Sequence, residues 1–159
     1  MKQADDAIAF EEASIEIEAS PEVVYGLVTA IERMGEWSPE AVGGRWLDGG
    51  SAQVGARFEG DNKSGEREWS RECEVAEAEP GRAFTFVVGG VEANCTWWSY
   101  ELEPTTAGTS LTERWWVVNK TPALQQATEE QFAQRVELAR QMLPATLAAM
   151  KQTAEAAAE

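Results

Sequence analysis

The sequence has no histidine, and this absence excludes several kinds of site at once. Catalytic triads built on Ser-His-Asp or Cys-His pairs need an imidazole as their base. Histidine-ligated zinc and iron sites need it as a ligand. Proton transfer in this chain would therefore depend on carboxylates, tyrosine, lysine or water, and we expect neither a metal ion nor a cofactor.

Cysteine is scarce, since only Cys73 and Cys95 are present. Each lies in a strand-like segment, and one further strand separates the two segments. Two strand spacings amount to about 10 Å, which is too far for a disulfide. We predict that both residues are free thiols.

Positive charge is also scarce, because 13 Lys and Arg face 28 Asp and Glu, for a net charge of −15. Such a charge repels phosphate backbones and anionic lipid headgroups, so we expect no nucleic-acid partner. No apolar run reaches the roughly 20 residues that cross a bilayer, and residues 1–12 lack the basic and apolar blocks of a signal peptide. We expect a cytoplasmic protein that does not insert into membranes.

What the sequence does contain is a large apolar share, 43% of its 159 residues, with seven tryptophans. This length fits one domain with an unusually aromatic interior. We predict a flexible N-terminal tail over residues 1–12, one ligand-binding domain over 13–153 and a fraying end over 154–159.

The order of secondary structure can be predicted from hydrophobic periodicity and turn residues. Alternation over Ala13–Ala19 predicts a strand, and Ser20-Pro21-Glu22 then opens the first of two short helices. Glycine-rich turns divide residues 41–118 into six strands of an antiparallel meander. Thr121-Pro122 opens one long C-terminal helix.

The long helix carries one apolar stripe, which we expect to face the sheet. Its members are Phe132, Val136, Ala139, Leu143, Leu147 and Met150. Pro144 interrupts the helix and is expected to bend it around a curved sheet. One strand, two short helices, six strands and a long helix predict an α+β fold, with a curved seven-stranded antiparallel sheet and a cavity between sheet and helix.

Five short motifs, in this order, resemble a known superfamily over Ala13–Lys151. They are Ser20-Pro21-Glu22-Val23-Val24-Tyr25, Trp37-Ser38-Pro39-Glu40, Phe58-x-Gly60-x-Asn62, Glu79-Pro80-Gly81-Arg82, and Trp98-x-Tyr100-x-Leu102 leading into Gly108-Thr109. The chain resembles the START-like, Bet v 1-like (SRPBCC) superfamily with the helix-grip fold, and within it the bacterial polyketide cyclase/dehydrase-type proteins. The resemblance implies a cavity for lipids, sterols, quinones, hormones or polyketide intermediates, and in some members aldol cyclisation or dehydration. No catalytic motif of a characterised cyclase matches this sequence.

Glu113 is the candidate acid or base, because it alternates with Leu111 and Trp115 and would point inward with them. Burial among aromatic rings would raise its pKa toward neutrality. Two alternatives stay open at this stage. Glu113 could form an ion pair with Arg71 or another nearby arginine, or a register shift of one residue could place it in water.

Further candidates would line the same cavity. Arg71 could hold a carboxylate, enolate or phenolate of a ligand, or form a buried Arg–Glu pair. The resemblance implies that Glu40, after the second short helix, lies at the cavity mouth, where its charge either gates entry or is simply solvated. The predicted ligand-binding residues are Trp37, Phe58, Asn62, Trp69, Arg71, Phe86, Trp98, Tyr100, Trp115, Phe132, Val136 and Leu143. For each ring taken alone, plain core packing is the alternative.

These observations predict a protein that binds a hydrophobic, aromatic or polycyclic small molecule. In the first hypothesis Glu113 catalyses polyketide-type cyclisation or dehydration without metal or histidine chemistry. In the second, the cavity is a non-catalytic carrier or sensor for a lipid, quinone or aromatic metabolite. In the third, an exposed face that includes Trp97 and Trp116 docks a second subunit, as in a homodimer.

Overall fold

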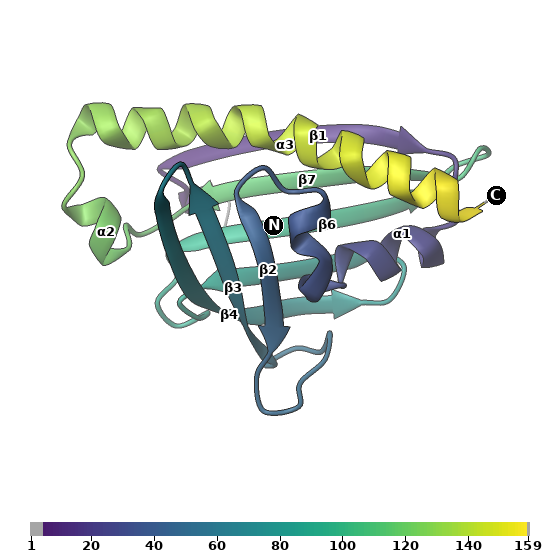
Figure 1. Ribbon diagram of the computed structural model, residues 1–159, viewed down its shortest axis with the longest axis horizontal. Helices are drawn as coiled ribbons and strands as arrows, with labels where there is room; N and C mark the ends of the chain where they lie inside the picture. Colours follow the sequence, from purple (N-terminus) through teal and green to yellow (C-terminus); the bar gives the residue numbers. More distant parts are fainter. Residues whose placement is uncertain (1–4, 159) are drawn as a thin grey trace.

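The computed structural model describes residues 5–158 and has the predicted α+β architecture (Figure 1). Its strands are β1 (Ala9–Ile17), β2 (Ala41–Trp46), β3 (Arg57–Ser64), β4 (Arg67–Glu79), β5 (Ala83–Val88), β6 (Thr96–Pro104) and β7 (Thr109–Val117). Its helices are α1 (Pro21–Val28), the 3-10 helix η2 (Ile31–Glu36), α2 (Pro122–Gln125) and α3 (Glu129–Ala158). The strands form one antiparallel sheet in the order β1-β7-β6-β5-β4-β3-β2, and α3 lies along one side of it, as the helix-grip prediction requires.

Strand β1 begins at Ala9, earlier than the expected start at Ala13. Residues from Ala9 onward already pair with β7. Glu11 occupies an inward position of the alternation and forms an ion pair with Arg140 of α3. A charged residue at that position interrupts the hydrophobic alternation, which is why the sequence pattern starts too late.

Helix α1 forms where its N-terminal signals predict it. The Ser20 Oγ accepts a hydrogen bond from the Val23 N–H at 3.3 Å, and Pro21 takes the first helical position. The helix buries Val24, Leu27 and Val28 against the sheet. The 3-10 helix η2 follows and leads into β2 at the edge of the sheet.

The C-terminal helix is not the single element that the sequence predicted. Helix α2 ends at Gln125, and α3 starts only at Glu129. A reciprocal capping box fixes this second start, since the Thr128 Oγ1 accepts from the Gln131 N–H at 3.1 Å and the Gln131 Oε1 accepts from the Thr128 N–H at 2.9 Å. The break places α2 at the end of the molecule opposite α1 (Figure 1).

Helix α3 continues through Pro144 to Ala158. Ala154 is fully buried, and the last turns are held by Glu155, which accepts from the Glu18 N–H at 2.9 Å and from the Lys151 ammonium at 2.5 Å. Ala139, Leu143, Leu147 and Met150 are buried as the apolar stripe predicted.

The outer face of the sheet does not expose the tryptophans that we considered for subunit docking. Trp97 and Trp116 are 3% and 0% exposed, and their rings stack at 5.6 Å with planes 8° apart. The Trp97 Nε1 donates to the Asn94 Oδ1 at 2.7 Å. The prediction of a docking face at these two residues is therefore wrong, because Val87 and the alanines Ala7 and Ala76 pack against them.

The prediction of free thiols at Cys73 and Cys95 is confirmed.

Candidate functional site

A cavity of about 570 Å³ lies between the inner face of the sheet and α3. Strands β3 to β7 form its floor, and η2, α2 and α3 contribute to its rim. A volume of this size is typical of sites for drug-sized organic molecules. The curved sheet bends away from α3 here, and the side chains of one helix do not fill the space.

Most of the residues that the sequence predicted for the cavity do line it. They are Trp37, Phe58, Asn62, Trp69, Arg71, Phe86, Trp98, Tyr100, Trp115 and the candidate acid Glu113. Alternate residues of a strand point to the same face, so the correct register of β3, β4, β6 and β7 brings these side chains together.

Three predicted residues of α3 do not line the cavity. Phe132 lies under the Lys120 ammonium, which is 4.7 Å from its ring centroid. Val136 packs against the buried cluster to which Leu143 belongs. The neighbouring stripe of α3 faces the cavity instead, and it consists of Gln131, Gln134, Arg135, Leu138, Met142 and Thr146.

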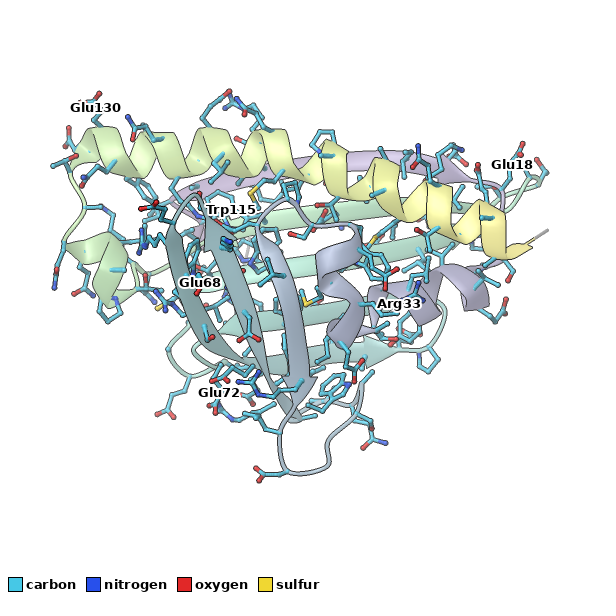
Figure 2. The ribbon with its side chains drawn as sticks, in the orientation of Figure 1. Glu18, Arg33, Glu68, Glu72, Trp115 and Glu130 are labelled. Carbon is cyan, nitrogen blue, oxygen red and sulfur yellow. The ribbon has the colours of Figure 1, made fainter. Side chains whose placement is uncertain are left out.

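The aromatic wall is a chain of ring contacts from β3 to β7, with rings from four of these five neighbouring strands. Phe58 meets Phe86 edge to face at 5.0 Å, and Phe86 stacks on Trp98 at 6.5 Å. Trp98 then meets Trp115 at 6.4 Å. Trp115 lies beneath α3 (Figure 2). Its buried Nε1 has no hydrogen-bond partner among the described residues. Rings arranged in this way offer faces and edges to a planar ligand.

Glu113 is the polar group at the inner end of this wall. Its residue is 2% exposed, and its Oε1 has no hydrogen-bond partner among residues 5–158. Burial raises the pKa of its carboxyl to about 8, although a hydrogen bond from Tyr100 acts in the lowering direction. The carboxyl is therefore mostly neutral at pH 7 and can exchange a proton near that pH.

Neither alternative reading of Glu113 holds. It faces the cavity rather than water, and Arg71 does not pair with it. Arg71 lies on β4, separated from β7 by β5 and β6, and its Nη1 donates to the Ser70 carbonyl at 3.0 Å. Within the described part of the chain, Glu113 has no ammonium or guanidinium at ion-pair distance, and Arg71 has no carboxylate at that distance.

The sequence missed an ion pair between Glu40 and Arg135. The Arg135 Nη1 donates to Glu40 Oε1 at 3.0 Å and to Oε2 at 3.3 Å. The Glu40 side chain is 11% exposed and the Arg135 side chain 26%, so Glu40 is largely buried rather than solvated. Both residues line the cavity, and the pair joins the start of β2 to α3.

The described chain offers no site for a metal ion, because residues 5–158 contain no cluster of three or more His, Cys, Asp or Glu side chains. None of its helices combines the length and the apolar composition that crossing a bilayer requires.

Comparison with known proteins identifies one family across nearly the whole chain. The family model described as "Polyketide cyclase / dehydrase and lipid transport" matches residues 11–155. A polyketide cyclase-like protein of Corynebacterium glutamicum is 35% identical, with a TM-score of 0.65, over 94% of this chain and 93% of its own. No curated protein matches the sequence.

Two more distant structures share the fold. The di-domain ARO/CYC StfQ from the steffimycin biosynthetic pathway is 16% identical with a TM-score of 0.72, over 99% of this chain and 54% of its own. A protein of Nitrosomonas europaea is 14% identical with a TM-score of 0.67, over 91% of this chain and 92% of its own.

Proposed function

The chain belongs to the polyketide cyclase/dehydrase and lipid transport family, and from this premise we propose that its cavity binds a hydrophobic, aromatic or polycyclic small molecule and that Glu113 transfers protons during its cyclisation or dehydration. One observation carries the catalytic part. Glu113 is a buried carboxyl with an unpartnered oxygen, and it lines an aromatic cavity. Burial raises its pKa to about 8, within reach of neutral pH.

The aromatic wall supports the choice of ligand. Phe86, Trp98 and Trp115 present ring surfaces along one side of the cavity. Planar ring systems gain offset-stacked or edge-to-face contacts from such a wall, beyond the area that they bury. An extended apolar chain would gain the burial but not the ring contacts.

A single carboxyl suffices for an aldol cyclisation. The Glu113 carboxylate takes a proton from the carbon beside a ketone, which leaves an enolate and a neutral carboxyl. The enolate carbon then bonds to a second carbonyl carbon, and the resulting alkoxide takes the proton back from Glu113. Dehydration follows the same logic, since the carboxylate removes the α-proton and returns it to the departing hydroxyl, which leaves as water.

The second candidate is a non-catalytic carrier or sensor. Among residues 5–158 the cavity lining contains two carboxyl side chains, Glu40 and Glu113, and Glu40 is held by Arg135. An isolated neutral carboxyl can orient a ligand by donating one hydrogen bond, without any reaction. The two candidates make the same binding prediction and differ only in proton transfer.

Deuterium exchange into 2-tetralone, a bicyclic aromatic ketone, separates them. In D₂O, ¹H NMR follows the loss of the α-protons beside the carbonyl. A catalytic Glu113 accelerates the exchange about 100-fold over buffer, as positioned general bases do. Glu113→Gln abolishes the acceleration while tetralone still binds, and the exposed Glu66→Gln control exchanges like the wild type.

The other outcomes are equally informative. Binding of tetralone without Glu113-dependent exchange contradicts the catalytic role and favours the carrier. Absence of binding contradicts both candidates, and native mass spectrometry of freshly purified protein then tests whether any small molecule accompanies the chain.

A further inference from the structure

The arginines of this acid-rich chain divide into two groups. All nine lie within the described residues, and seven form ion pairs: Arg33, Arg45, Arg57, Arg82, Arg114, Arg135 and Arg140. Arg67 and Arg71 have no carboxylate at ion-pair distance among residues 5–158. Both of these arginines line the cavity. In a protein with a net charge of −15, the guanidinium groups left without an anion are thus the ones at the candidate site.

The two arginines are held side by side by the geometry of β4. Arg67, Trp69 and Arg71 are alternate residues of one strand and project from the same face. The Arg67 guanidinium lies over the Trp69 ring, 4.9 Å from its centroid. Stacking fixes the plane of a guanidinium but leaves its N–H groups free to donate.

The space beside Arg71 is open. Its partner across the strands is Gly60 of β3, which has no side chain and whose added Cβ would meet nothing within 4 Å. The Nη1 of Arg71 uses one hydrogen bond on the Ser70 carbonyl. A guanidinium has five N–H donors, so most of its capacity is available to a ligand.

The other charged groups around the cavity leave this position positive. Arg135 also lines the cavity from α3, but Glu40 holds it. Glu113 is mostly neutral at pH 7 because burial raises its pKa to about 8. No ionised carboxylate of the lining is therefore free to neutralise Arg67 and Arg71.

We propose that Arg67 and Arg71 bind an anionic group of the ligand, so that the cavity takes an amphipathic aromatic anion: a carboxylate, sulfonate or phosphate joined to a ring system. This inference rests on the proposed binding function and names the ligand class that it takes. Bidentate hydrogen bonds from guanidinium groups match the geometry of all three anions.

The strand register places this anion site far from Glu113. Cys73, Val88, Thr96 and Val117 form one row across β4 to β7. Arg71 lies on one side of this row and Glu113 on the other. In a flat sheet the two residues would be about 20 Å apart along the strands and about 14 Å apart across them. The curvature of the sheet shortens this distance. The ligand is therefore held by its charged end at β4 while its rings extend along the aromatic wall toward Glu113.

Two fluorescent probes that differ only by an anionic group test this site. 8-Anilinonaphthalene-1-sulfonate carries a sulfonate, and N-phenyl-1-naphthylamine is the same ring system without it. Each is titrated into the wild type, Arg67→Gln, Arg71→Gln and the double variant. The matched control is Arg82→Gln, which removes the same charge from an exposed arginine outside the cavity lining.

The expected result is selective. The double variant loses about tenfold or more in affinity for the sulfonate, because a charge-assisted hydrogen bond is worth roughly one decade in binding. Affinity for the neutral probe stays within about twofold, which also shows that the variant is folded, and Arg82→Gln changes neither probe by more than about twofold.

Four outcomes contradict the proposal. Equal losses for both probes would mean that the arginines only shape the cavity. Sulfonate affinity that falls no further than in Arg82→Gln would mean that the anion binds elsewhere. If the wild type binds neither probe, the proposed function fails together with the anion site; if it binds the neutral probe but not the sulfonate, only the anion site fails.

Discussion

Tyr100 and Glu113 are register partners across β6 and β7, facing each other on the inner side of the sheet. Burial raises the pKa of Glu113 to about 8 and exceeds the opposing influence of the hydrogen bond from Tyr100. Burial and the neighbouring Glu113 raise the pKa of Tyr100 well above its ordinary value as well. The pair is therefore a proton-carrying site at neutral pH, and its titration has consequences for stability.

Glu113 makes the fold less stable as pH rises. Below pH 4.5, its ordinary pKa, the carboxyl is protonated in both the folded and the unfolded chain. Between 4.5 and about 8 only the unfolded chain ionises, so folding stability falls by about 1.4 kcal/mol per pH unit, and above 8 it levels off. Glu113→Gln lacks this loss. We therefore expect the difference in unfolding free energy between Glu113→Gln and the wild type to increase by roughly 4 kcal/mol, in favour of the variant, from pH 5 to pH 8. Urea unfolding at each pH measures it.

The control for this comparison is Glu66→Gln, at an exposed turn position. Its stability curve should run parallel to that of the wild type over the same pH range. Parallel curves for Glu113→Gln would show instead that Glu113 ionises alike in the folded and unfolded chains.

The Glu40–Arg135 pair should contribute measurably to stability, because both side chains are largely buried. Glu40→Gln or Arg135→Met leaves one charge without its partner and should cost about 1–3 kcal/mol of unfolding free energy. The double variant should cost less than the two single changes together. The exposed pair Arg33–Glu36 provides the matched cycle, and its coupling should be smaller than that of the buried pair because water screens it. Additive losses at Glu40 and Arg135 would show that the pair carries no coupling.

Gly60 offers a way to fill the cavity without disturbing the fold. An added Cβ at Gly60 meets nothing within 4 Å, and the residue lines the cavity. Gly60→Leu should therefore retain its melting temperature and lose about tenfold or more in affinity for N-phenyl-1-naphthylamine. Gly43 of β2 is equally unobstructed but lies outside the lining, so Gly43→Leu should bind like the wild type. Equal binding by both variants would place the probe outside this cavity.

The strands of the site could be predicted from the sequence because alternation determines which face a residue occupies. One correct register for β3 brings Phe58 and Asn62 inward together, and one for β7 does the same for Glu113 and Trp115. The same periodicity explains why Arg71 was expected at the cavity. Whether it met Glu113 depended on strand order and curvature, which a local pattern does not contain.

The helical side of the site was harder to predict. Apolar periodicity identified the stripe of α3 that packs in the core, including Leu143, whereas the cavity faces the adjacent stripe, including Arg135 and Met142. A stripe that lines a partly polar cavity mixes charged, polar and apolar residues and has no strong hydrophobic period. The Thr128-x-x-Gln131 capping box was a readable signal for the start of α3.

The Glu40–Arg135 pair had no readable signal, since the two residues are 95 positions apart. Each looks like an ordinary surface charge within its own segment. Only the packing of α3 over the start of β2 brings them together and buries them.

The proposed proton transfer requires Glu113 to be a neutral, buried carboxyl inside the cavity. A ¹³C NMR titration of the side-chain carboxyl carbons measures the protonation of Glu113 directly, and Glu113→Gln identifies its resonance. Tyr100→Phe should raise the pKa of Glu113, because it removes a hydrogen bond that lowers this pKa. We predict that the Glu113 resonance titrates with a pKa of about 8. A midpoint near the ordinary value of 4.5 would show that the carboxyl is ionised and solvated at neutral pH, and would contradict the proposed proton transfer.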